Sequence, residues 1–346
     1  MTPGFGYDRS GANRADPDGD DGVIHGNPIA IVILSLDDEA RTLRCLESVF
    51  ALDYEPIEVV LVDNGSKDAT LETVARRYPA THRLRSATNL GVAGGRNRGV
   101  RFVLENFPGA HVLFLDNDAW IEPDALAAMV SVLEQRPTTG LVAPKIYRPG
   151  PGRRIAGFGG HHINWYTGSI RTVGSGCVDH GQFDGRNPIT CNGAAFLVRR
   201  EVLHRIGGFD DAFNPYGWED LDFSLRAVRA GHRIALAPSA RVYHEGGREG
   251  RGFAVPRYER SKMRGYFRLI RRHTTWAQWI CFVAVFPVRA VAMSLRELLG
   301  GRGSIPWARL RGALGGLFGA SQRAGSRRDE FHAAGDRAGD WIVRSD

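Results

Sequence analysis

Three short, continuous runs of apolar residues determine what this chain can fold into. They span residues 29–34, 58–63 and 111–116, and β-branched side chains are frequent in them. Runs of this length without polar alternation are typical of parallel strands that are buried on both faces. Amphipathic helical patterns are predicted at 39–52, 68–78 and 95–107. Strands that alternate with helices predict a doubly wound, Rossmann-like α/β sheet with its ligand site at the carboxyl ends of the strands.

The rest of the chain divides into segments by composition. We expect a disordered leader at 1–27, an α/β domain at 28–250, a basic and amphipathic helical extension at 251–320 and a flexible tail at 321–346. Within the α/β domain, weaker patterns predict strands at 140–146 and 190–198 around an irregular Gly-rich stretch at 149–189, and a helix at 218–231.

The formal net charge of +7 is distributed unevenly along the chain. Residues 1–247 carry 26 Lys and Arg against 30 Asp and Glu, a net charge of −4, whereas residues 248–346 carry 19 against 8, a net charge of +11. This asymmetry predicts that the C-terminal part meets a polyanion. No fold signature of nucleic-acid binding accompanies the charge, so we expect an anionic membrane surface as the partner and no nucleic acid.

The cysteines and the N-terminus indicate the compartment. The chain has 4 cysteines, widely spaced and without a CxxC pair, which fits neither a zinc site nor a disulfide framework. The first residues are rich in Gly and Asp and lack the apolar stretch of a signal peptide. We therefore expect reduced thiols and a cytoplasmic location.

Two carboxylates separated by one residue follow the predicted strand at 111–116. Asp116 and Asp118 can both approach one hard cation, or one can bind a metal while the other binds a ribose hydroxyl. A solvated turn is the alternative, because Asp and Asn are common in turns. His244 ends a short β pattern and offers a neutral imidazole as a third ligand for Mn²⁺, although a single His is usually structural.

Two further segments are candidates for binding a nucleotide: the end of a predicted strand and a Gly-rich loop. Asp63 ends the predicted strand at 58–63 and can accept hydrogen bonds from a base or a ribose, while the residues after it equally form a turn and a helix cap. The stretch 89–99 contains four glycines, which let backbone amides approach a phosphate or a uracil-like ring. It is not a GxGxxG motif, so a dinucleotide site is disfavoured, and close packing of a helix on the sheet is the alternative.

Three acidic residues open the predicted helix at 218–231. They are Glu219, Asp220 and Asp222. Acids in a first turn commonly interact with the helix dipole, which explains any one of them. A carboxylate beside a reacting hydroxyl can also act as a general base, and the nearby rings of Tyr216 and Trp218 can offer a face to a sugar.

Taken in order, these motifs resemble a family 2 glycosyltransferase of the GT-A fold. The matching stretches lie between about Ile29 and Gly247 and read IVILSLDDEARTLRCLESV, VDNGSKDAT, NLGVAGGRNRG, FLDNDA, CNGAAFLVRR…GGFDDAF, WEDLDFSLRAVRAGHR and VYHEGG. The chain is most similar to bacterial rhamnosyl- and galactofuranosyltransferases of cell-envelope polysaccharide synthesis. The resemblance implies a nucleotide-diphospho-sugar transferase fold for residues 28–250.

The resemblance also implies roles for individual residues. Asp220 would be the catalytic base, with Glu219 beside it. The metal, Mg²⁺ or Mn²⁺, would be held by Asp116, Asp118 and His244. The donor nucleotide would be bound by Asp37, Asp63, Asn89, Gly91, Arg96 and Asp116. The acceptor would be bound by Asn192, Tyr216 and Trp218. The chain departs from the family at Leu36 and Asp37, where an aromatic residue followed by Asn is usual, and this leaves the identity of the donor open.

The C-terminal segment 256–299 combines an Arg-rich part with an apolar part. The longest uninterrupted apolar run, Trp279 to Val288, has 10 residues, and Pro287 and Arg289 break the longer stretch. This falls short of the ~20 residues that span a bilayer, so we expect a helix lying in the membrane interface. Packing on the α/β domain, or in a homo-oligomer, is the alternative.

We therefore expect a metal-dependent, inverting glycosyltransferase that is peripheral at the inner face of the plasma membrane. The donor would be dTDP-rhamnose or a UDP-sugar, and the acceptor a cell-envelope polysaccharide or a lipid-linked glycan. A phosphohydrolase of the haloacid dehalogenase type is disfavoured, because its nucleophile lies near the N-terminus and Ile121 does not match its motif. The other alternative is a catalytically silent scaffold or glycan-binding partner with the same fold.

Overall fold

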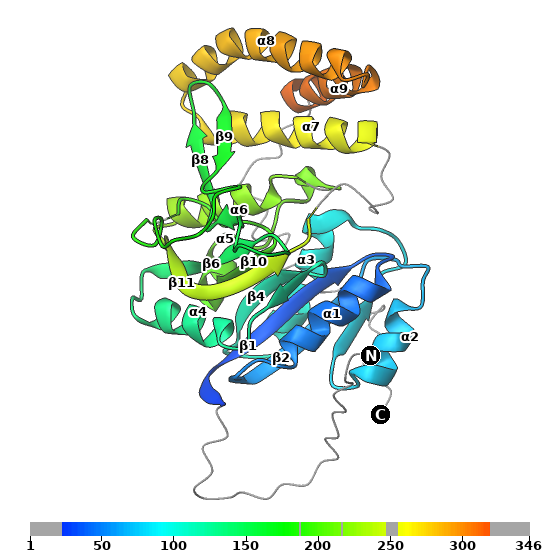
Figure 1. Ribbon diagram of the computed structural model, residues 1–346, viewed down its shortest axis with the longest axis vertical. Coiled ribbons are helices and arrows are strands. Elements are labelled where there is room, and N and C mark those ends of the chain that lie inside the picture. Colours follow the sequence, from blue (N-terminus) through cyan, green and yellow to red (C-terminus); the bar gives the residue numbers. More distant parts are fainter. Residues whose placement is uncertain (1–22, 187, 216, 247–254, 319–346) are drawn as a thin grey trace, which may run out of the picture.

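The computed structural model describes residues 23–186, 188–215, 217–246 and 255–318 (Figure 1). The remaining residues include most of the expected leader and the expected tail. Tyr216, expected to bind the acceptor, also lies outside the described residues.

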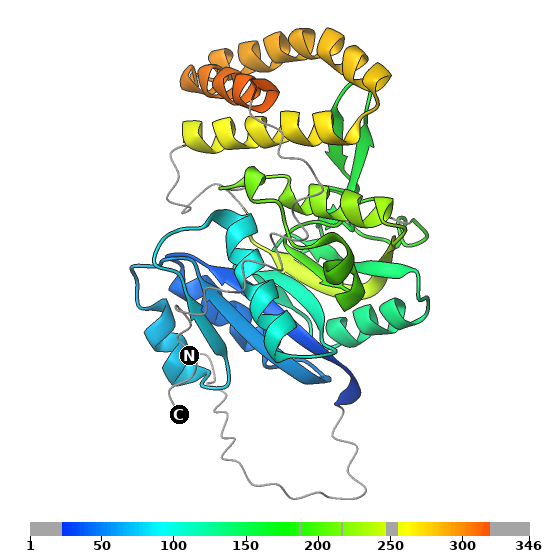
Figure 2. The ribbon, with the colours of Figure 1, turned by 180° about the vertical axis from the view of Figure 1, so that it is seen from behind.

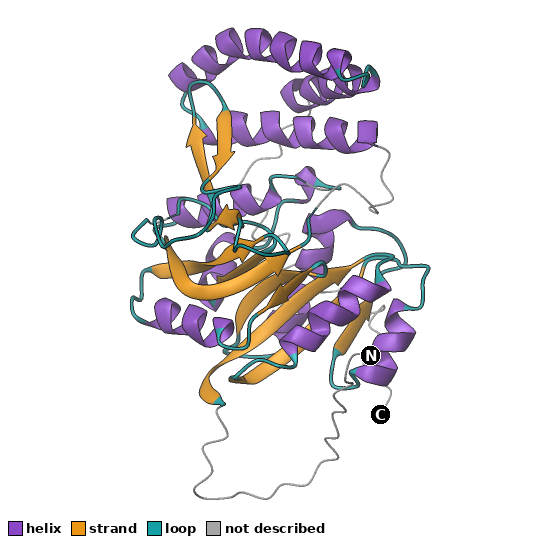
Figure 3. Ribbon diagram, in the orientation of Figure 1, coloured by secondary structure: helices purple, strands orange, loops and turns teal. Residues whose placement is uncertain are grey.

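A mixed sheet forms the centre of the molecule (Figure 3). In the described part its strands follow the order β3-β2-β1-β4-β10-β6-β11-β5, and β7 pairs with β6. The strands are β1 Ile24–Ser35, β2 Tyr54–Asp63, β3 His82–Arg85, β4 His111–Asp116, β5 Ala119–Ile121, β6 Thr139–Tyr147, β7 Ile155–Phe158, β10 Ala195–Val198 and β11 Arg233–His244. β3, β2, β1 and β4 are parallel, whereas β10 runs antiparallel between β4 and β6.

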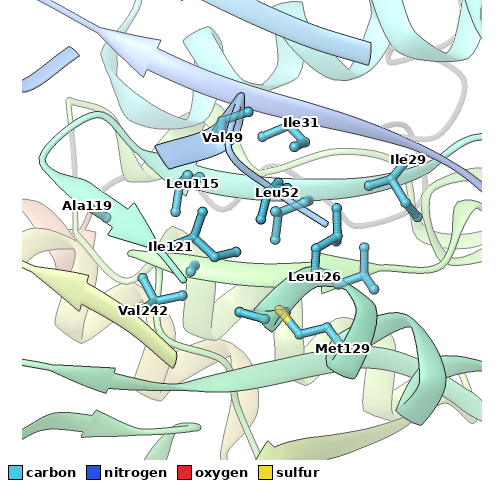
Figure 4. Packing of buried hydrophobic residues seen from close by; sticks show 14 of the residues in the cluster. Ile29, Ile31, Val49, Leu52, Leu115, Ala119, Ile121, Leu126, Met129 and Val242 are labelled. Atoms are coloured by element: carbon cyan, nitrogen blue, oxygen red, sulfur yellow. The ribbon is translucent and has the colours of Figure 1, made fainter. Parts of the chain in front are cut away.

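Helices cover both faces of the sheet, as the continuous apolar strands require. They are α1 Glu39–Val49, α2 Thr70–Arg77, α3 Gly91–Asn106, α4 Ala125–Glu134, α5 Arg200–Ile206 and α6 Glu219–Arg229. Ile29, Ile31 and Ile33 of β1 point into one core with α1, α2 and α4, part of which Figure 4 shows. Ala30 and Val32 point into the opposite core with α3, α5 and α6. This alternation gives the strand no solvent-facing side.

Three further helices form a layer of their own, which we call the helical cap. They are α7 Val255–His273, α8 Trp276–Leu299 and α9 Ser304–Phe318. The cap lies above α6 in Figures 1 and 2, and the hairpin of β8 His161–Asn164 and β9 Ser169–Thr172 reaches up to it. The hydroxyl of Tyr266 on α7 donates to the carbonyl of Gly168 in that hairpin at 2.7 Å.

A buried ion cluster holds α7 on the α/β domain. Asp222 on α6 is fully buried, and its carboxylate accepts from Arg226 at 2.8 Å, from Arg272 at 2.7 Å and from His273 at 3.0 Å. Arg272 also pairs with Asp210 at 2.7 Å. Burial raises the pKa of Asp222, but these neighbours outweigh it and hold that pKa well below its usual range. We call these four residues, Asp222, Arg226, Arg272 and His273, the Asp222 cluster.

The predicted α/β sheet with a C-terminal helical extension is confirmed, but three local predictions are wrong. Residues 24–27, assigned to the leader, begin β1, and Ile24 and His25 pair with β2. Residues 190–194 are not part of the strand, which spans Ala195–Val198. The Gly-rich stretch 149–189 is less irregular than expected, since it contains β7, β8 and β9.

The apolar C-terminal segment also differs from its prediction. Pro287 and Arg289 interrupt the apolar run but not the helix, and α8 continues over 24 residues. With a mean hydropathy of 1.6 it is long and apolar enough to cross a membrane by length and composition, contrary to the estimate from the uninterrupted run. Only 6% of its most apolar window is buried, so it is not an ordinary core helix.

We expect Asp222→Asn to destabilise the protein by about 3 kcal/mol, because Arg226 would lose its buried counter-charge, Arg272 would keep only Asp210, and His273 would lose a carboxylate acceptor. Urea unfolding at pH 7 measures the change. Glu72→Gln, which alters an exposed carboxylate on α2, is the matched control and should shift stability by no more than about 0.5 kcal/mol. Equal effects of the two substitutions would contradict a stabilising role for the cluster.

Candidate active site

Two carboxylates and one imidazole meet beyond the end of β4. Asp118 Oδ1 lies 3.0 Å from His244 Nε2, and Asp116 Oδ2 lies 3.8 Å from the same nitrogen. The sheet register brings them together, because β5 pairs antiparallel with β11 so that His244 faces Ala119. One ligand atom from each of the three lies within 4.8 Å of the others.

This triad fits a divalent cation of the Mg²⁺ or Mn²⁺ type. Carboxylate oxygens suit both ions, and the imidazole favours Mn²⁺. The three side chains converge from β4, from the loop after it and from β11, so no rearrangement of the backbone is needed to bring their ligand atoms to one point. Asp118 is buried and Asp116 and His244 are half-buried, which leaves the triad a route to a ligand.

Arg96 on α3 connects the triad to the acidic start of α6. Its Nη2 donates to Asp116 Oδ1 and to the carbonyl of Gly193, both at 2.8 Å. Its Nη1 lies 3.5 Å from Glu219 Oε1 and has no hydrogen-bond partner among the described residues. Burial opposes the charge of Arg96, but Asp116, Glu219 and Asp220 outweigh it and raise the pKa of the guanidinium.

The two acidic residues at the start of α6 are both strongly perturbed. Glu219 is buried, and its Oε2 accepts from the backbone N–H of Gly217 at 2.8 Å. Asp220 Oδ2 accepts from the N–H of Gly193 at 2.7 Å. Burial, together with the charge of Asp220, raises the pKa of Glu219 to about 7 against the opposing effect of Arg96. Burial also raises the pKa of Asp220.

Asp63 lies near the same edge of the sheet, beside Ser35, and leaves one carboxylate oxygen unsatisfied. Its side chain is 1% exposed, and its Oδ1 accepts from the N–H of Ser66 at 3.0 Å. Among the residues that the structure describes, its Oδ2 has no hydrogen-bond partner, and Arg85 Nε lies 3.8 Å away. A buried carboxylate oxygen in this state is costly unless a ligand donates to it.

The other residues expected at the donor side have structural partners. Asp37 is exposed, with a φ of +48°, and its Oδ1 accepts from the N–H of Lys67 at 2.6 Å. The side-chain oxygen of Asn89 accepts from Asn64 at 3.0 Å and from the N–H of Gly91 at 2.8 Å. Gly91 needs to be glycine, because it has a φ of +74° and a Cβ there would lie 2.4 Å from Asn214 Oδ1.

The two described residues expected at the acceptor side also have partners. Asn192 accepts from the N–H of Ala194 at 3.0 Å through its side-chain oxygen. Trp218, directly before Glu219, has a φ of +75°, and its indole N–H donates to the carbonyl of Lys262 at 2.8 Å. The indole therefore attaches α6 to α7 of the helical cap.

A cavity of about 720 Å³ adjoins the triad and contains residues that the sequence patterns did not single out. His244, Glu245 and Gly246 line it together with Arg44 and Arg148. The guanidinium of Arg44 lies 3.4 Å from the ring centroid of Trp120 and 2.6 Å from a Glu245 oxygen. Guanidinium groups at such a position suit a diphosphate. Isolated arginines carry no motif, so no sequence pattern pointed to Arg44 or Arg148.

Asn64 and Gly193 were also missed. Asn64 donates to Asn89 and to the carbonyl of Gly91 and accepts from the N–H of Leu90 at 2.9 Å, so it shapes the loop before α3. Gly193 contacts Arg96 through its carbonyl and Asp220 through its N–H. Asn64 stands in a motif that also fits a turn, and Gly193 acts only through its backbone.

The mixed sheet carries an Asp-x-Asp pair at its edge, and comparison with known proteins identifies the class of enzyme. The family described as Glycosyl transferase family 2 matches residues 30–207, and Glycosyltransferase like family 2 matches residues 177–277. The chain therefore belongs to glycosyl transferase family 2. The predicted family, fold and enzyme class are confirmed.

The chain is similar in sequence to several named bacterial proteins. The chain is 28% identical over 262 residues to the N-acetylglucosaminyl-diphospho-decaprenol L-rhamnosyltransferase of Mycobacterium tuberculosis, covering 67% of this chain and 81% of that protein. It is 28% identical over 247 residues to an O-antigen biosynthesis protein of Myxococcus xanthus, covering 67% of this chain and 18% of that protein.

Two solved structures share the fold. One is GalNAc-T7 with UDP, GalNAc and Mn²⁺, with a TM-score of 0.56, 18% identity, and coverage of 71% of this chain and 48% of that one. The other is the mannosyltransferase PcManGT from Pyrobaculum calidifontis with GDP-Man and Mn²⁺, with a TM-score of 0.52, 16% identity, and coverage of 85% and 88%.

We expect Glu219→Gln to change the pH dependence of stability. The raised pKa means that folded Glu219 binds a proton that the unfolded chain has released, so stability falls as pH rises from the ordinary value of 4.5 to about 7. The amide can still accept from Gly217 but cannot ionise. The variant should therefore lose on the order of 2 kcal/mol less than wild type over this window in urea unfolding. Parallel pH profiles would contradict the raised pKa.

Proposed function

We propose that the chain is an inverting glycosyltransferase that moves a sugar from a nucleotide-diphosphate donor to a cell-envelope polysaccharide or a lipid-linked acceptor. One observation carries the proposal. Arg96 bonds to Asp116 and to the carbonyl of Gly193, whose N–H bonds to Asp220, so a candidate metal site and a candidate base lie around a single buried cation. Donor and acceptor groups are thereby held within one site, as a direct displacement requires.

The donor half of the proposal depends on the triad. Asp116, Asp118 and His244 would hold Mg²⁺ or Mn²⁺, which neutralises charge on the departing nucleotide diphosphate when bound. Arg44 and Arg148 in the adjoining cavity would contact the phosphates. Asp63, with its unsatisfied Oδ2, would accept a hydrogen bond from the nucleotide base, and Asp37, Asn89 and Gly91 would shape that side of the site.

The acceptor half assigns the general base to Asp220. Asp220 is half-buried while Glu219 is buried against Gly217 and Arg96, so Asp220 is the more accessible carboxylate. A raised pKa strengthens it as a base, because its affinity for the acceptor proton increases. Asp220 would take the proton of the acceptor hydroxyl as that oxygen attacks the anomeric carbon, and a single displacement inverts the configuration. Asn192 and Trp218 would position the acceptor, and the same role is proposed for Tyr216.

The named relatives support the choice of substrates. The Mycobacterium tuberculosis relative is named for transfer of L-rhamnose to a lipid-linked diphosphate sugar, and the Myxococcus xanthus relative for O-antigen biosynthesis. We accordingly propose dTDP-rhamnose or a UDP-sugar as donor. The scaffold alternative is disfavoured, because the triad, Arg96, Glu219 and Asp220 are present together.

We also propose that the protein is cytoplasmic and attaches to the inner face of the plasma membrane through the helical cap. The outer face of α8 exposes large apolar side chains, among them Ile280, Val283, Val288, Val291, Leu295 and Leu298. Several arginines of α7 bind the α/β domain instead: Arg264 donates to the carbonyl of Asn214, Arg268 to that of Ala212, and Arg272 to Asp222. The membrane contact is therefore assigned to α8 more than to the Arg-rich helix. A homo-oligomer is the competing use of this face.

We expect Asp220→Asn to lower the turnover number at least 100-fold, because the amide cannot accept the acceptor proton. Transfer from dTDP-rhamnose and UDP-sugars to a short-chain N-acetylglucosaminyl-diphospho-prenol measures the effect, and calorimetry with the free nucleotide should give an affinity within about threefold of wild type. Asp124→Asn, on an exposed carboxylate, is the control. Turnover within tenfold of wild type would refute the assignment of the base.

A further inference from the structure

A second cavity, of about 210 Å³, lies between the helical cap and the β8–β9 hairpin. Its walls come from Gly168 and Ile170 of the hairpin side, from α7, α8 and α9, and from Trp218. One water molecule requires about 10–15 Å³, so the cavity is far larger than a water site. A pocket that encloses a whole small molecule has roughly 300 Å³ or more, so the cavity is smaller than that. A cavity of this size suits one part of a larger ligand.

Trp218 places this cavity directly beside Glu219 and Asp220, the acidic pair at the start of α6. Trp218 immediately precedes Glu219 and is held in a left-handed conformation by the bond from its indole to α7. On its other side, the N–H of Gly217 bonds to Glu219, and a Cβ on Gly217 would lie 3.2 Å from Cγ of Lys262. The cavity wall is thus one residue away from the proposed catalytic residues.

The cavity has an excess of positive charge. Glu259 is neutralised by Arg309 at 2.8 Å. Lys262 and Arg289 also line the cavity, and neither has a carboxylate within ion-pair distance among the described residues. The ammonium of Lys262 lies 5.7 Å from the ring centroid of Trp218 and 5.1 Å from that of Tyr258. Arg289 donates to the carbonyl of Thr167. Two cations without a carboxylate partner among the described residues, one of them held against aromatic rings, are suited to an anionic ligand.

The remaining walls are apolar and adaptable. Met263 and Tyr266 of α7 face Phe286 and Met293 of α8 across the cavity. Methionine and aromatic side chains accommodate irregular apolar groups well. The same helix α8 exposes its apolar outer face to the surroundings. A ligand that joins an anionic group to an apolar chain would contact both kinds of wall.

We propose that this cavity binds the head of the lipid-linked acceptor. Its phosphate or diphosphate contacts Lys262 and Arg289, and the first part of its apolar chain lies against Met263, Phe286 and Met293. The proposal rests on the proposed function and deepens it, because it assigns the acceptor class and places the head group beside Trp218, two residues before Asp220.

Farnesyl diphosphate is the probe, and calorimetry on the full chain measures its affinity. Inorganic pyrophosphate supplies the charge alone, farnesol the chain alone, and short-chain phosphatidylglycerol a membrane lipid. We expect farnesyl diphosphate to bind at least tenfold more tightly than each of these. Lys262→Met should weaken it at least tenfold, while Lys262→Arg should keep most of the affinity. Arg311→Met removes an exposed charge from α9 of the same cap and is the matched control.

Three results would overturn the assignment. They are an unchanged affinity in Lys262→Met, equal loss in Arg311→Met, or equal binding of phosphatidylglycerol, which would assign the cavity to membrane lipid. Binding of UDP or dTDP with Mn²⁺ is measured on the same samples. Nucleotide binding without farnesyl diphosphate binding would remove this inference and leave the proposed donor site, whereas the reverse would remove the donor site and leave the cavity.

Discussion

A single buried guanidinium organises the candidate active site. The side chain of Arg96 is 4% exposed and contacts Asp116 at the end of β4, the carbonyl of Gly193 before β10, and Glu219 at the start of α6. These partners come from three separate parts of the chain. A buried charge is tolerated only if it is paired, so the positions of β4, β10 and α6 depend on one another. Loss of Arg96 would leave the carboxylates of Asp116, Glu219 and Asp220 close together without this cation.

The alternating strands and helices of the first half of the chain were predicted best. The apolar runs predict β1, β2 and β4, and because these runs are apolar on both faces, they also predict a core on each side of the sheet, around Ile31 and around Val32. The candidate site residues at the strand ends were predicted for the same reason, because Asp63 and Asp116 lie where the apolar runs stop. In the structure they lie opposite Ser35 and Leu34, so the register of β1 brings both to one edge.

The parts that escaped prediction depend on contacts distant in sequence. Ile24 belongs to a strand because β2 pairs with it, not because of a local pattern. The role of Asp222 could not be read from its helix turn, since its partners Arg272 and His273 follow some 50 residues later. The arginines of α7 illustrate the same limit. Composition indicated a surface for anionic lipid, whereas several of these side chains bond to the α/β domain.

The helical cap is attached to the helix that carries the proposed base. The Asp222 cluster anchors α7 to α6, and Asp220 lies in the first turn of α6. Trp218, directly before α6, also bonds to α7. The cap is therefore attached to α6 on either side of Glu219 and Asp220, at Trp218 and at Asp222. On the far side, α8 exposes an apolar face. This arrangement links an exposed apolar surface to the proposed acceptor side through packed and hydrogen-bonded side chains.

The most direct test of the account is nucleotide binding at the triad. UDP, dTDP and GDP are each titrated with and without Mn²⁺ into wild type and Asp118→Ala. The account predicts binding that requires the metal and is weakened at least tenfold in the variant, because Asp118 would supply one of three protein ligands. Binding of none of the nucleotides, or binding equally strong without metal and in the variant, would contradict the assignment of the donor site.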